Sequence, residues 1–591
     1  MRSLLRRPSR LAAVTALMAV ALTASAALAE DTEPVAFDYV NNPGVSEPVY
    51  AGADIARTVV QVTAFDGVKL YVEVVRPKAE GRYPVILEAS PYHGTLADRD
   101  GTRILPDPKV GGASIGLTGF FAPRGYAVVY MDLRGTGRSG GCLDHLGPND
   151  GKDMKTIVEW AAAQSWSNGK VGMTGHSYVG STPMVAAAQN PTGLTTIVPS
   201  AGLASMYDHQ FQGGVPYLAQ WVGPMAAYEA LTFGRMLPPG INNAPNLGNT
   251  GDDFGNTNNA QYTGCGLPQS SVTAGEGQAT GRWQAWHTAR DSSAGAKAAQ
   301  IPTFLVHGVN DNAARIPAAQ WFMDRGGRAG DKAWIGQWDH GSGCCPNRRG
   351  MQWPFALLAW FDYHLKGLDV NTGPAAEVFM NDAGTVASAV SNGGEMTTLQ
   401  ADGFPSGTST LNLYPVATGN ALATEAPTAA GTKTFAGDPR NAALSGANNV
   451  TFTTPAFDTD VVIAGVPTLE LAASVTVPQV HLIATVYDVN ESNQSRRIGT
   501  FAINPLLKDG VRDYAVVVPG TKYILKPPGF AMGHQVLAGH KLSLSITTSD
   551  AHHVPHTAID PQITVHTGPG NTALHLPVVD APVVVADDVE R

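Results

Sequence analysis

The stretch Val171-Gly-Met-Thr-Gly-His-Ser177-Tyr-Val-Gly180 places a serine between glycines, after a short apolar run and before an alanine-rich one. This order predicts a tight turn from a buried strand into a helix, with the serine at the turn. Glycines at 175 and 180 suit such a turn, because side chains there would clash where strand and helix approach. Ser177 would then lie at a helix N-terminus, whose N–H groups can stabilise a developing oxyanion. The usual pattern is G-x-S-x-G, but here Val179 stands where the second glycine is expected, and the glycine comes one residue late.

The length and charge of the chain limit the classes of protein that it can belong to. Its 591 residues are too many for one hydrophobic core, so two or three domains are expected. A formal net charge of -10, with no long basic run, argues against nucleic acid as a partner. The 65 glycines and 41 prolines indicate many turns, and hence much loop or β-structure.

The N-terminal segment has the composition of an export signal. Arginines precede an apolar run from Leu11 to about Leu22, and small residues follow up to Ala29. We expect residues 1–29 to be a signal peptide, cleaved after Ala29, and the mature protein to be secreted. The pair Arg6-Arg7 leaves both general and twin-arginine export open. No other stretch has the roughly 18 apolar residues that a membrane span needs, so no membrane association is expected after cleavage.

Export gives meaning to the four cysteines, Cys142, Cys265, Cys344 and Cys345. An even number in an oxidising compartment favours two disulfides, and four cysteines allow three pairings. A bond between the adjacent Cys344 and Cys345 would be strained, which favours a distant partner for each. Zinc is the alternative interpretation, but the chain lacks C-x-x-C spacing and paired histidines. We therefore predict neither a metal nor a cofactor.

Short apolar runs alternate with helix-like segments through the first part of the chain. A hairpin is expected around Asp66-Gly67. The pattern predicts strands over 83–89, 126–131, 171–173, 195–199, 301–307 and 333–336, and helices over 153–164, 317–326 and 353–365. Strands that alternate with helices form parallel βαβ units, so the sequence predicts an α/β fold over 30–370.

The segment 203–293 interrupts this alternation. It begins with aromatic and Met-rich helical stretches between Tyr207 and Met236 and continues as a polar tract. A long insertion between two core strands predicts a helical cap over the active site. The pair Asp252-Asp253 lacks the spacing of a calcium loop and is expected to lie in a surface loop.

The last part of the chain has a different pattern. Short Val, Leu and Thr runs alternate with turn residues and show almost no helix signal, which predicts a β-sandwich or jelly roll over 371–591. The histidines of His552-His553-Val-Pro-His556 suggest a metal at first sight. Pro555 prevents a helix that would pair positions 552 and 556, so a loop is expected there.

A serine nucleophile needs a base and a carboxylate that orients the base. The strand expected to end at His307 continues into Asp311, and the next strand continues into His340. Serine, acid and histidine then follow one another in the chain order of an α/β-hydrolase, with the last two at strand ends. Ser177, Asp311 and His340 are the predicted catalytic triad. The neighbouring His176, His307 and Asp339 are expected to be structural.

Several motifs, in order along the chain, resemble one family. They are Ser90-Pro-Tyr92, Asp132-x-Arg-Gly-x-Gly-x-Ser-x-Gly141, the segment from Trp166 to Gly180, Asp311, Trp338-x-His340, the segment from Trp360 to Gly367, Thr451-Phe-Thr-Thr-Pro455 and Ile463-x-Gly465-x-Pro467. The chain resembles the X-prolyl dipeptidyl-peptidases, cocaine esterase and related acyl esterases from about residue 56 to its C-terminus. The late glycine is also a feature of this family.

The resemblance implies a fold and a set of roles. It implies an α/β-hydrolase core with an inserted cap, followed by a C-terminal jelly roll of the galactose-binding-like type. Ser177 would be the nucleophile, His340 the base and then acid, and Asp311 the orienting carboxylate. The family builds its oxyanion hole from the N–H after the nucleophile and a tyrosine hydroxyl, here Tyr178 and Tyr92.

The substrate follows less directly from the resemblance. X-prolyl peptidases hold a free N-terminal ammonium with a carboxylate, for which Asp208 is the candidate. Relatives that act on α-amino-acid esters carry acids directly after the triad aspartate, where this chain has Asn312-Ala313-Ala314. Phe211, Tyr217 and Trp221 are candidates for an apolar acyl or proline pocket, with a cap core as their alternative role. X-prolyl dipeptidyl-peptidase activity, broad acyl-esterase activity and a catalytically inactive glycan- or surface-binding protein are the three hypotheses. The oligomeric state stays open, with a homodimer as one possibility.

Overall fold

The computed structural model describes residues 36–93, 103–104, 115–218, 280–340, 352–381, 396–438, 448–580 and 584–586. The expected signal peptide, Trp221 and three of the cysteines (Cys265, Cys344 and Cys345) lie outside the described residues, as does most of the expected cap. No helix among the described residues is long and apolar enough to cross a membrane.

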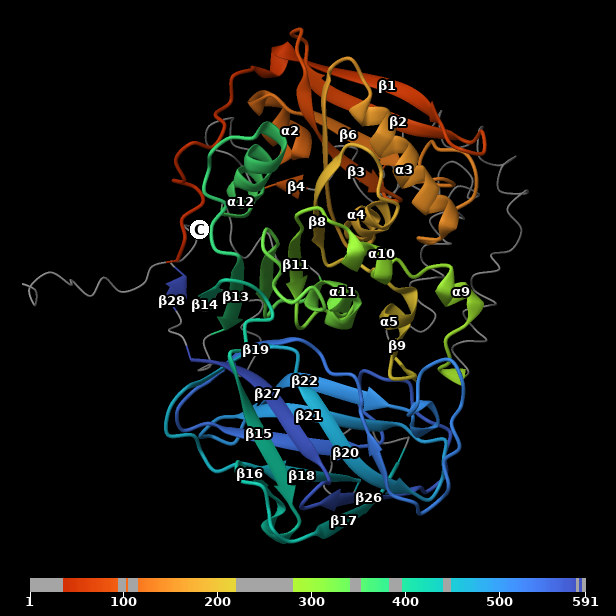
Figure 1. The fold of residues 1–591 in the computed structure, drawn as a ribbon, viewed down its shortest axis with the longest axis vertical. Helices are drawn as coiled ribbons and strands as arrows, with labels where there is room; N and C mark the ends of the chain where they lie inside the picture. The colour runs from red at the N-terminus through yellow and green to blue at the C-terminus, as the bar shows by residue number, and fades with distance from the viewer. Residues whose placement is uncertain are drawn as a thin grey trace, which may run out of the picture.

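A large twisted sheet organises the first part of the chain, drawn in red to green in Figure 1. Its strand order is β1-β2-β6-β3-β7-β8-β11-β12-β13-β14-β28. The bounds are β1 Ile55–Thr63, β2 Lys69–Pro77, β3 Tyr83–Ser90, β6 Ala127–Asp132, β7 Ser167–His176, β8 Leu194–Ser200, β11 Phe304–Gly308, β12 Lys332–Gly336, β13 Ala376–Asn381, β14 Met396–Ala401 and β28 Val584–Ala586. Strand pairs from β6 to β13 are parallel, whereas β1, β2, β14 and β28 pair antiparallel.

Helices cover both faces of this sheet. Their bounds are α2 Leu117–Phe121, α3 Pro148–Ala162, α4 Tyr178–Ala188, α5 Met206–Gln210, α9 Ala285–Thr288, α10 Ser293–Ala298, α11 Gln320–Met323 and α12 Gln352–Phe361, the last continued by a π-helical turn at Asp362–Lys366. Alternate residues of β3 and β6 point to opposite faces. Leu87 and Val129 belong to the core cluster that contains α3 and α4, and Ile86 and Val128 to the one that contains α2 and α12. The layers are therefore helix, sheet and helix.

Two segments differ from the predicted helices. The expected helix over 317–326 is a 3-10 turn, Ile316–Ala319, followed by the short α11. The expected helix after Tyr207 ends with α5 at Gln210. Phe211–Gln212 and Val215–Pro216 then pair as strands β9 and β10. Gly213 and Gly214 explain the reversal, because both have a positive φ, of 53° and 80°.

The second part of the chain is an all-β sandwich, drawn in teal and blue below the first part in Figure 1. Its strands are β15 Ser409–Val416, β16 Ala421–Ala423, β17 Gly431–Ala436, β18 Asn449–Thr453, β19 Val461–Gly465, β20 Thr468–Val475, β21 Leu482–Val489, β22 Ser495–Ile503, β23 Tyr523–Leu525, β24 Met532–Val536, β25 Lys541–Thr547, β26 Gln562–Thr567 and β27 Ala573–Val579. Alternate residues are buried, as Val450 and Phe452 are on β18. These residues form one core cluster.

Three strands beyond residue 371 lie in the first sheet and not in the sandwich. β13 pairs with β12, β14 with β13, and β28 with β14. The sandwich itself begins at β15, so the predicted division at 370/371 falls between two adjacent strands of one sheet. An alternating pattern identifies a strand but not the sheet that it joins, because pairing partners are distant in sequence.

The sandwich contacts the first part through hydrogen bonds at β9 and β10. The Gln212 side chain donates to the carbonyls of Thr500 and Pro528, each at 2.8 Å. The Gly213 carbonyl accepts from the Asn504 N–H at 2.9 Å. A Cβ on Gly213 would lie 2.3 Å from the Ala502 carbonyl oxygen, which requires a glycine at this contact.

A second contact holds the strand end that precedes the predicted histidine. Gln337 follows β12, and its side-chain nitrogen lies 2.7 Å from the Gly533 carbonyl and 2.6 Å from Nδ1 of His534. The Arg496 guanidinium donates to its side-chain oxygen. His534 is hydrogen-bonded in turn to Asp488 of β21 at 2.9 Å. Residues of β21, β22 and β24 thus hold the loop that leads to His340.

We predict that Gly213→Ala destabilises the protein by about 1–3 kcal/mol, because the new methyl group overlaps a backbone carbonyl and φ is positive. Urea unfolding of the full chain measures this change. Gly52→Ala is the matched control, since a Cβ there meets nothing within 4 Å and φ is not positive. Equal stability of the two variants would contradict the contact.

Candidate active site

Ser177 lies at a strained turn between β7 and α4. Its backbone has φ 64° and ψ -128°, a conformation that few residues other than glycine adopt. The Ser177 N–H donates to the carbonyl of Ser200 on β8 at 2.9 Å. A Cβ on Gly180 would lie 2.1 Å from that same carbonyl oxygen, and one on Gly175 2.6 Å from the Val179 carbonyl. The glycine at 180 is thus required where α4 passes β8, which explains its position.

The structure brings Ser177, His340 and Asp311 together in one hydrogen-bonded series. Nε2 of His340 lies 2.7 Å from Oγ of Ser177, and Nδ1 lies 2.7 Å from Oδ2 of Asp311. Asp311 is placed by the loop after β11, where its other oxygen accepts the N–H groups of Ala313 and Ala314 at 2.8 and 2.7 Å. This arrangement can transfer the hydroxyl proton of the serine to the imidazole.

Electrostatics favour an ionised carboxylate in this series. Burial opposes ionisation of Asp311, but the hydrogen bond and charge of His340 outweigh it and hold the pKa of Asp311 below its ordinary value. An ionised acid can orient the imidazole and stabilise its protonated form.

His176 and His307 are hydrogen-bonded to backbone carbonyls next to the triad. The His176 ring lies 4.8 Å from that of His340, and its Nε2 is 3.3 Å from the His340 carbonyl oxygen. Burial lowers the pKa of His176 to about 4, so this ring is neutral near pH 7. His307 is buried, and its Nε2 lies 2.6 Å from the Ala314 carbonyl in the Asp311 loop. Both residues have the structural roles expected for them.

The two residues predicted to hold an oxyanion lie next to each other. Tyr178 is the first residue of α4, so its N–H belongs to the first turn, whose N–H groups have no acceptor within the helix. The Tyr92 and Tyr178 rings meet edge to face at 6.5 Å. Tyr92 follows β3, and its N–H donates to Oγ of Ser90 at 3.0 Å.

A buried ion cluster next to Tyr92 was missed in the sequence. His93 is 2% exposed, with Nε2 3.0 Å from Glu88 of β3 and Nδ1 3.6 Å from Asp132 of β6. Burial alone would lower the pKa of His93, but Asp132 and Glu88 raise it to about 9. His93 is therefore an imidazolium near pH 7 that joins the ends of β3 and β6 beside Tyr92. Charged residues inside two apolar strand runs were the signal that could have revealed it.

The predicted substrate contacts have different surroundings. Asp208 lines a pocket of about 490 Å³. Gln320 and, from the second part of the chain, residues 466–470 and 526–529 also line this pocket. None of the three triad residues lines it. Burial raises the pKa of Asp208 to about 7. Phe211 is 2% exposed, and its ring stacks on that of Tyr207 with 4.9 Å between the ring centres. Phe211 is therefore packed in a core, which is the alternative to its expected role in an apolar substrate pocket.

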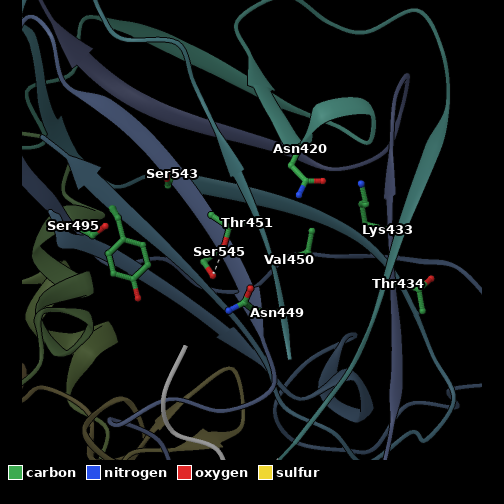
Figure 2. Close-up of a pocket in the computed structure, with 10 residues that line it drawn as sticks. Asn420, Lys433, Thr434, Asn449, Val450, Thr451, Ser495, Ser543 and Ser545 are labelled. Carbon is green, nitrogen blue, oxygen red and sulfur yellow. Dashed lines mark hydrogen bonds between the residues drawn. The ribbon is translucent and has the colours of Figure 1, made fainter. Parts of the chain in front are cut away.

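A separate polar pocket lies in the sandwich, as Figure 2 shows. Its volume is about 560 Å³. Hydroxyl and amide side chains from β17, β18, β21 and β25 line it, among them Thr451 and Ser545, which are hydrogen-bonded at 3.0 Å. No triad residue lines this pocket.

Cys142 is disulfide-bonded, and its partner lies outside the described residues. The pairing of the other cysteines therefore stays a prediction. Among the described residues, no group of three or more His, Cys, Asp or Glu is arranged to hold a metal ion.

Comparison with known proteins identifies both parts of the chain. Residues 66–342 match the X-Pro dipeptidyl-peptidase family (S15), and residues 371–577 match the X-Pro dipeptidyl-peptidase C-terminal non-catalytic domain. A putative Xaa-Pro dipeptidyl-peptidase of Streptomyces avermitilis is 28% identical over 76% of this chain and 66% of its own length. One of Bacillus anthracis is 30% identical over 55% of each chain. The chain spans about half to two thirds of these curated relatives.

Cocaine esterase of a Rhodococcus species is 34% identical over 28% of this chain and 25% of its own length. Among solved structures, a CocE/NonD family hydrolase of Staphylococcus aureus aligns over 90% of this chain and 98% of its own, with a TM-score of 0.68 and 18% identity. An α-amino acid ester hydrolase aligns over 93% of this chain and 100% of its own, with a TM-score of 0.66 and 17% identity. These likenesses confirm the expected fold class, an α/β-hydrolase core followed by an all-β domain.

We predict that His93→Gln lowers kcat by about 10- to 100-fold with little change in KM, because it would displace the hydroxyl of Tyr92, the expected oxyanion donor. Tyr92→Phe should lower the rate by about 10²–10³-fold. Adding His93→Gln to Tyr92→Phe should then have almost no further effect. Steady-state kinetics of the four proteins on one substrate measure this. If the rate losses of the two single variants multiply in the double variant, His93 does not act through Tyr92.

Proposed function

Because the chain belongs to the X-Pro dipeptidyl-peptidase (S15) family, we propose that it is a serine hydrolase that releases X-Pro dipeptides through an acyl-enzyme at Ser177. The observation that carries this proposal is the unbroken series from Ser177 through His340 to Asp311, with 2.7 Å at each step. Family membership supports the bond class, and the relatives named Xaa-Pro dipeptidyl-peptidase support the proline preference.

In the first half-reaction Oγ of Ser177 attacks the substrate carbonyl carbon while Nε2 of His340 takes its proton. The negative charge on the carbonyl oxygen is held by the Tyr178 N–H and the Tyr92 hydroxyl. As the bond to the leaving group breaks, His340 gives its proton to that group, and the acyl chain remains on Ser177.

Water completes the cycle by the same route. His340 takes a proton from the water that attacks the acyl carbon, and it returns the proton to Oγ of Ser177 when the acid leaves. Asp311 stays ionised throughout and stabilises the imidazolium. These steps need no cofactor, because each proton moves between groups of the chain and the reactants.

Broad acyl-esterase activity is the alternative within the same mechanism. The similarity to cocaine esterase supports it over a shorter part of the chain. Export is proposed as well, and the disulfide at Cys142 supports an oxidising compartment. The polar pocket of Figure 2 supports the hypothesis of a catalytically inactive glycan-binding protein. That hypothesis does not explain the hydrogen-bonded triad.

We predict that Ser177→Ala abolishes hydrolysis of every amide and ester substrate while the unfolding midpoint stays within a few degrees of the parent. A fluorophosphonate probe, followed by peptide mass spectrometry, should label the parent protein at Ser177. Ser181→Ala removes a nearby hydroxyl and is the control, expected to retain the label. Labelling elsewhere, or activity of Ser177→Ala, would exclude this nucleophile.

We predict a pH dependence for amine-bearing substrates if Asp208 holds the ammonium. Its pKa is raised to about 7, so its charge is present above pH 7 and is lost as the pH falls through that value. KM for an Ala-Pro anilide should therefore rise below pH 7, whereas KM for the N-blocked anilide should not. In Asp208→Asn the two profiles should run parallel. Parallel profiles in the parent protein would show that Asp208 does not bind the amine.

A further inference from the structure

Arg315 is a buried cation in the loop that carries Asp311. It follows Asp311 by four residues and is only 3% exposed. Cζ of its guanidinium lies over the Tyr217 ring, 4.2 Å from the ring centre, which is within the range of a cation–π interaction. Tyr217 is completely buried where β10 meets the sandwich, and its N–H donates to the Gln210 carbonyl at 2.9 Å. The two side chains thus lie at the junction of the two domains.

Among the described residues, Nε of Arg315 and the Tyr217 hydroxyl are buried without a hydrogen-bond partner. Within the described part of the chain, no carboxylate forms an ion pair with Arg315, and its Nε has no hydrogen-bond acceptor. The Tyr217 hydroxyl likewise has no partner there. A buried guanidinium normally forms a bidentate pair with a carboxylate, as Arg134 does with Asp153 at 2.7 and 2.8 Å in this protein.

Charged side chains from both domains surround the pair. Arg497 of β22 is a second half-buried guanidinium within electrostatic reach of Arg315. Asp550 acts on both arginines, and Asp311 acts on Arg315 as well. One Asp550 oxygen already accepts from the N–H groups of His552 and His553 and lies 2.9 Å from Nδ1 of His553. Among the described residues, two cations and two carboxylates thus lie near one another, but neither carboxylate forms an ion pair with Arg315.

His552 adds no cation to this cluster near pH 7. Burial and the charge of Arg497 together lower the pKa of His552 to about 4. The lack of a direct partner for Arg315 among the described residues is costly, because an unpaired buried ion is strongly destabilising in a medium that solvates it poorly. A bound anion would remove that cost.

The cluster is electrostatically connected to the proposed reaction centre. His209 of α5 is buried, and the charges of His340, Asp311 and Arg315 all act on it. Arg315 and two triad residues therefore all lie within electrostatic reach of His209. The charge of Asp311 acts on Arg315, but no direct pair forms, because both oxygens of Asp311 are occupied by His340 and by backbone N–H groups.

We propose that Arg315, with the Tyr217 hydroxyl, binds a carboxylate carried by the substrate. The proposal rests on the serine-hydrolase function proposed above and specifies the substrate class of that site. A carboxylate matches a guanidinium fork and accepts a phenol hydrogen bond with its remaining lone pairs. Such a group is present either on the acyl side, as in a dicarboxylic half-ester, or on the leaving group, as in a peptide with a free C-terminus.

Two substrate pairs distinguish these sources. The acyl-side pair is 4-nitrophenyl hydrogen succinate against 4-nitrophenyl butyrate, and the leaving-group pair is Ala-Pro-Gly against Ala-Pro-Gly-amide. A hydrogen bond to a charged group corresponds to about a 10- to 100-fold preference in kcat/KM. The parent protein should show that preference for the carboxylate in one pair, which assigns the source. No preference in either pair would overturn the proposal.

Two variants locate the preference. Arg315→Met retains the length of the side chain without its charge, and it should remove the preference while the uncharged substrate of the same pair is still turned over. Tyr217→Phe removes only the hydroxyl and should lower the preference about 3- to 10-fold. An unchanged preference in a folded Arg315→Met protein would overturn the proposal. If Arg315→Met does not fold, an unchanged preference in Tyr217→Phe would do so.

Failure of the proposed function gives a different result. If Ser177 is not the nucleophile, the fluorophosphonate probe does not label Ser177, and the Ser177→Ala protein turns over the substrates at the same rate as the parent protein. If only the carboxylate site is wrong, labelling and turnover of neutral esters persist without any preference for charge.

Discussion

The carbonyl of Ser200 is the point on which the arrangement of the site depends. It accepts the Ser177 N–H and lies against Gly180, so it fixes both the turn and the entry of α4. The parallel register of β7 and β8, which sets His176 opposite Ser200, places that carbonyl there. Strain at Ser177 is tolerated because two strands and a helix determine its position together.

The all-β domain takes part in the same geometry. Gln337 stands between β12 and His340, and its side chain is held by Arg496, Gly533 and His534 of the sandwich. The histidine loop therefore has one support in each domain. A domain that matches a non-catalytic family can in this way determine the position of the base.

Local patterns predicted those features that depend on local physics. The turn at Ser177, the strand ends before Asp311 and His340, and the alternation of buried residues in β18 follow from glycine placement and from apolar periodicity. The cluster at His93 and the contacts of Gln337 and Arg315 could not be predicted in this way. Each depends on side chains from strands or domains far apart in sequence, such as Glu88 with Asp132 or Gln337 with His534. The pair Gly213-Gly214 is a turn signal in the sequence, but the apolar residues around it favoured the helix that was expected after Tyr207.

The sharing of the large sheet between the two matched regions has a consequence for protein engineering. A chain cut near residue 371, between the two regions that match known domains, would remove β13 from beside β12. The five residues of β12 are all buried, and they would become an open edge with unpaired backbone groups. Such an edge recruits other strands, so the isolated first region would be prone to self-association even though it contains the whole triad.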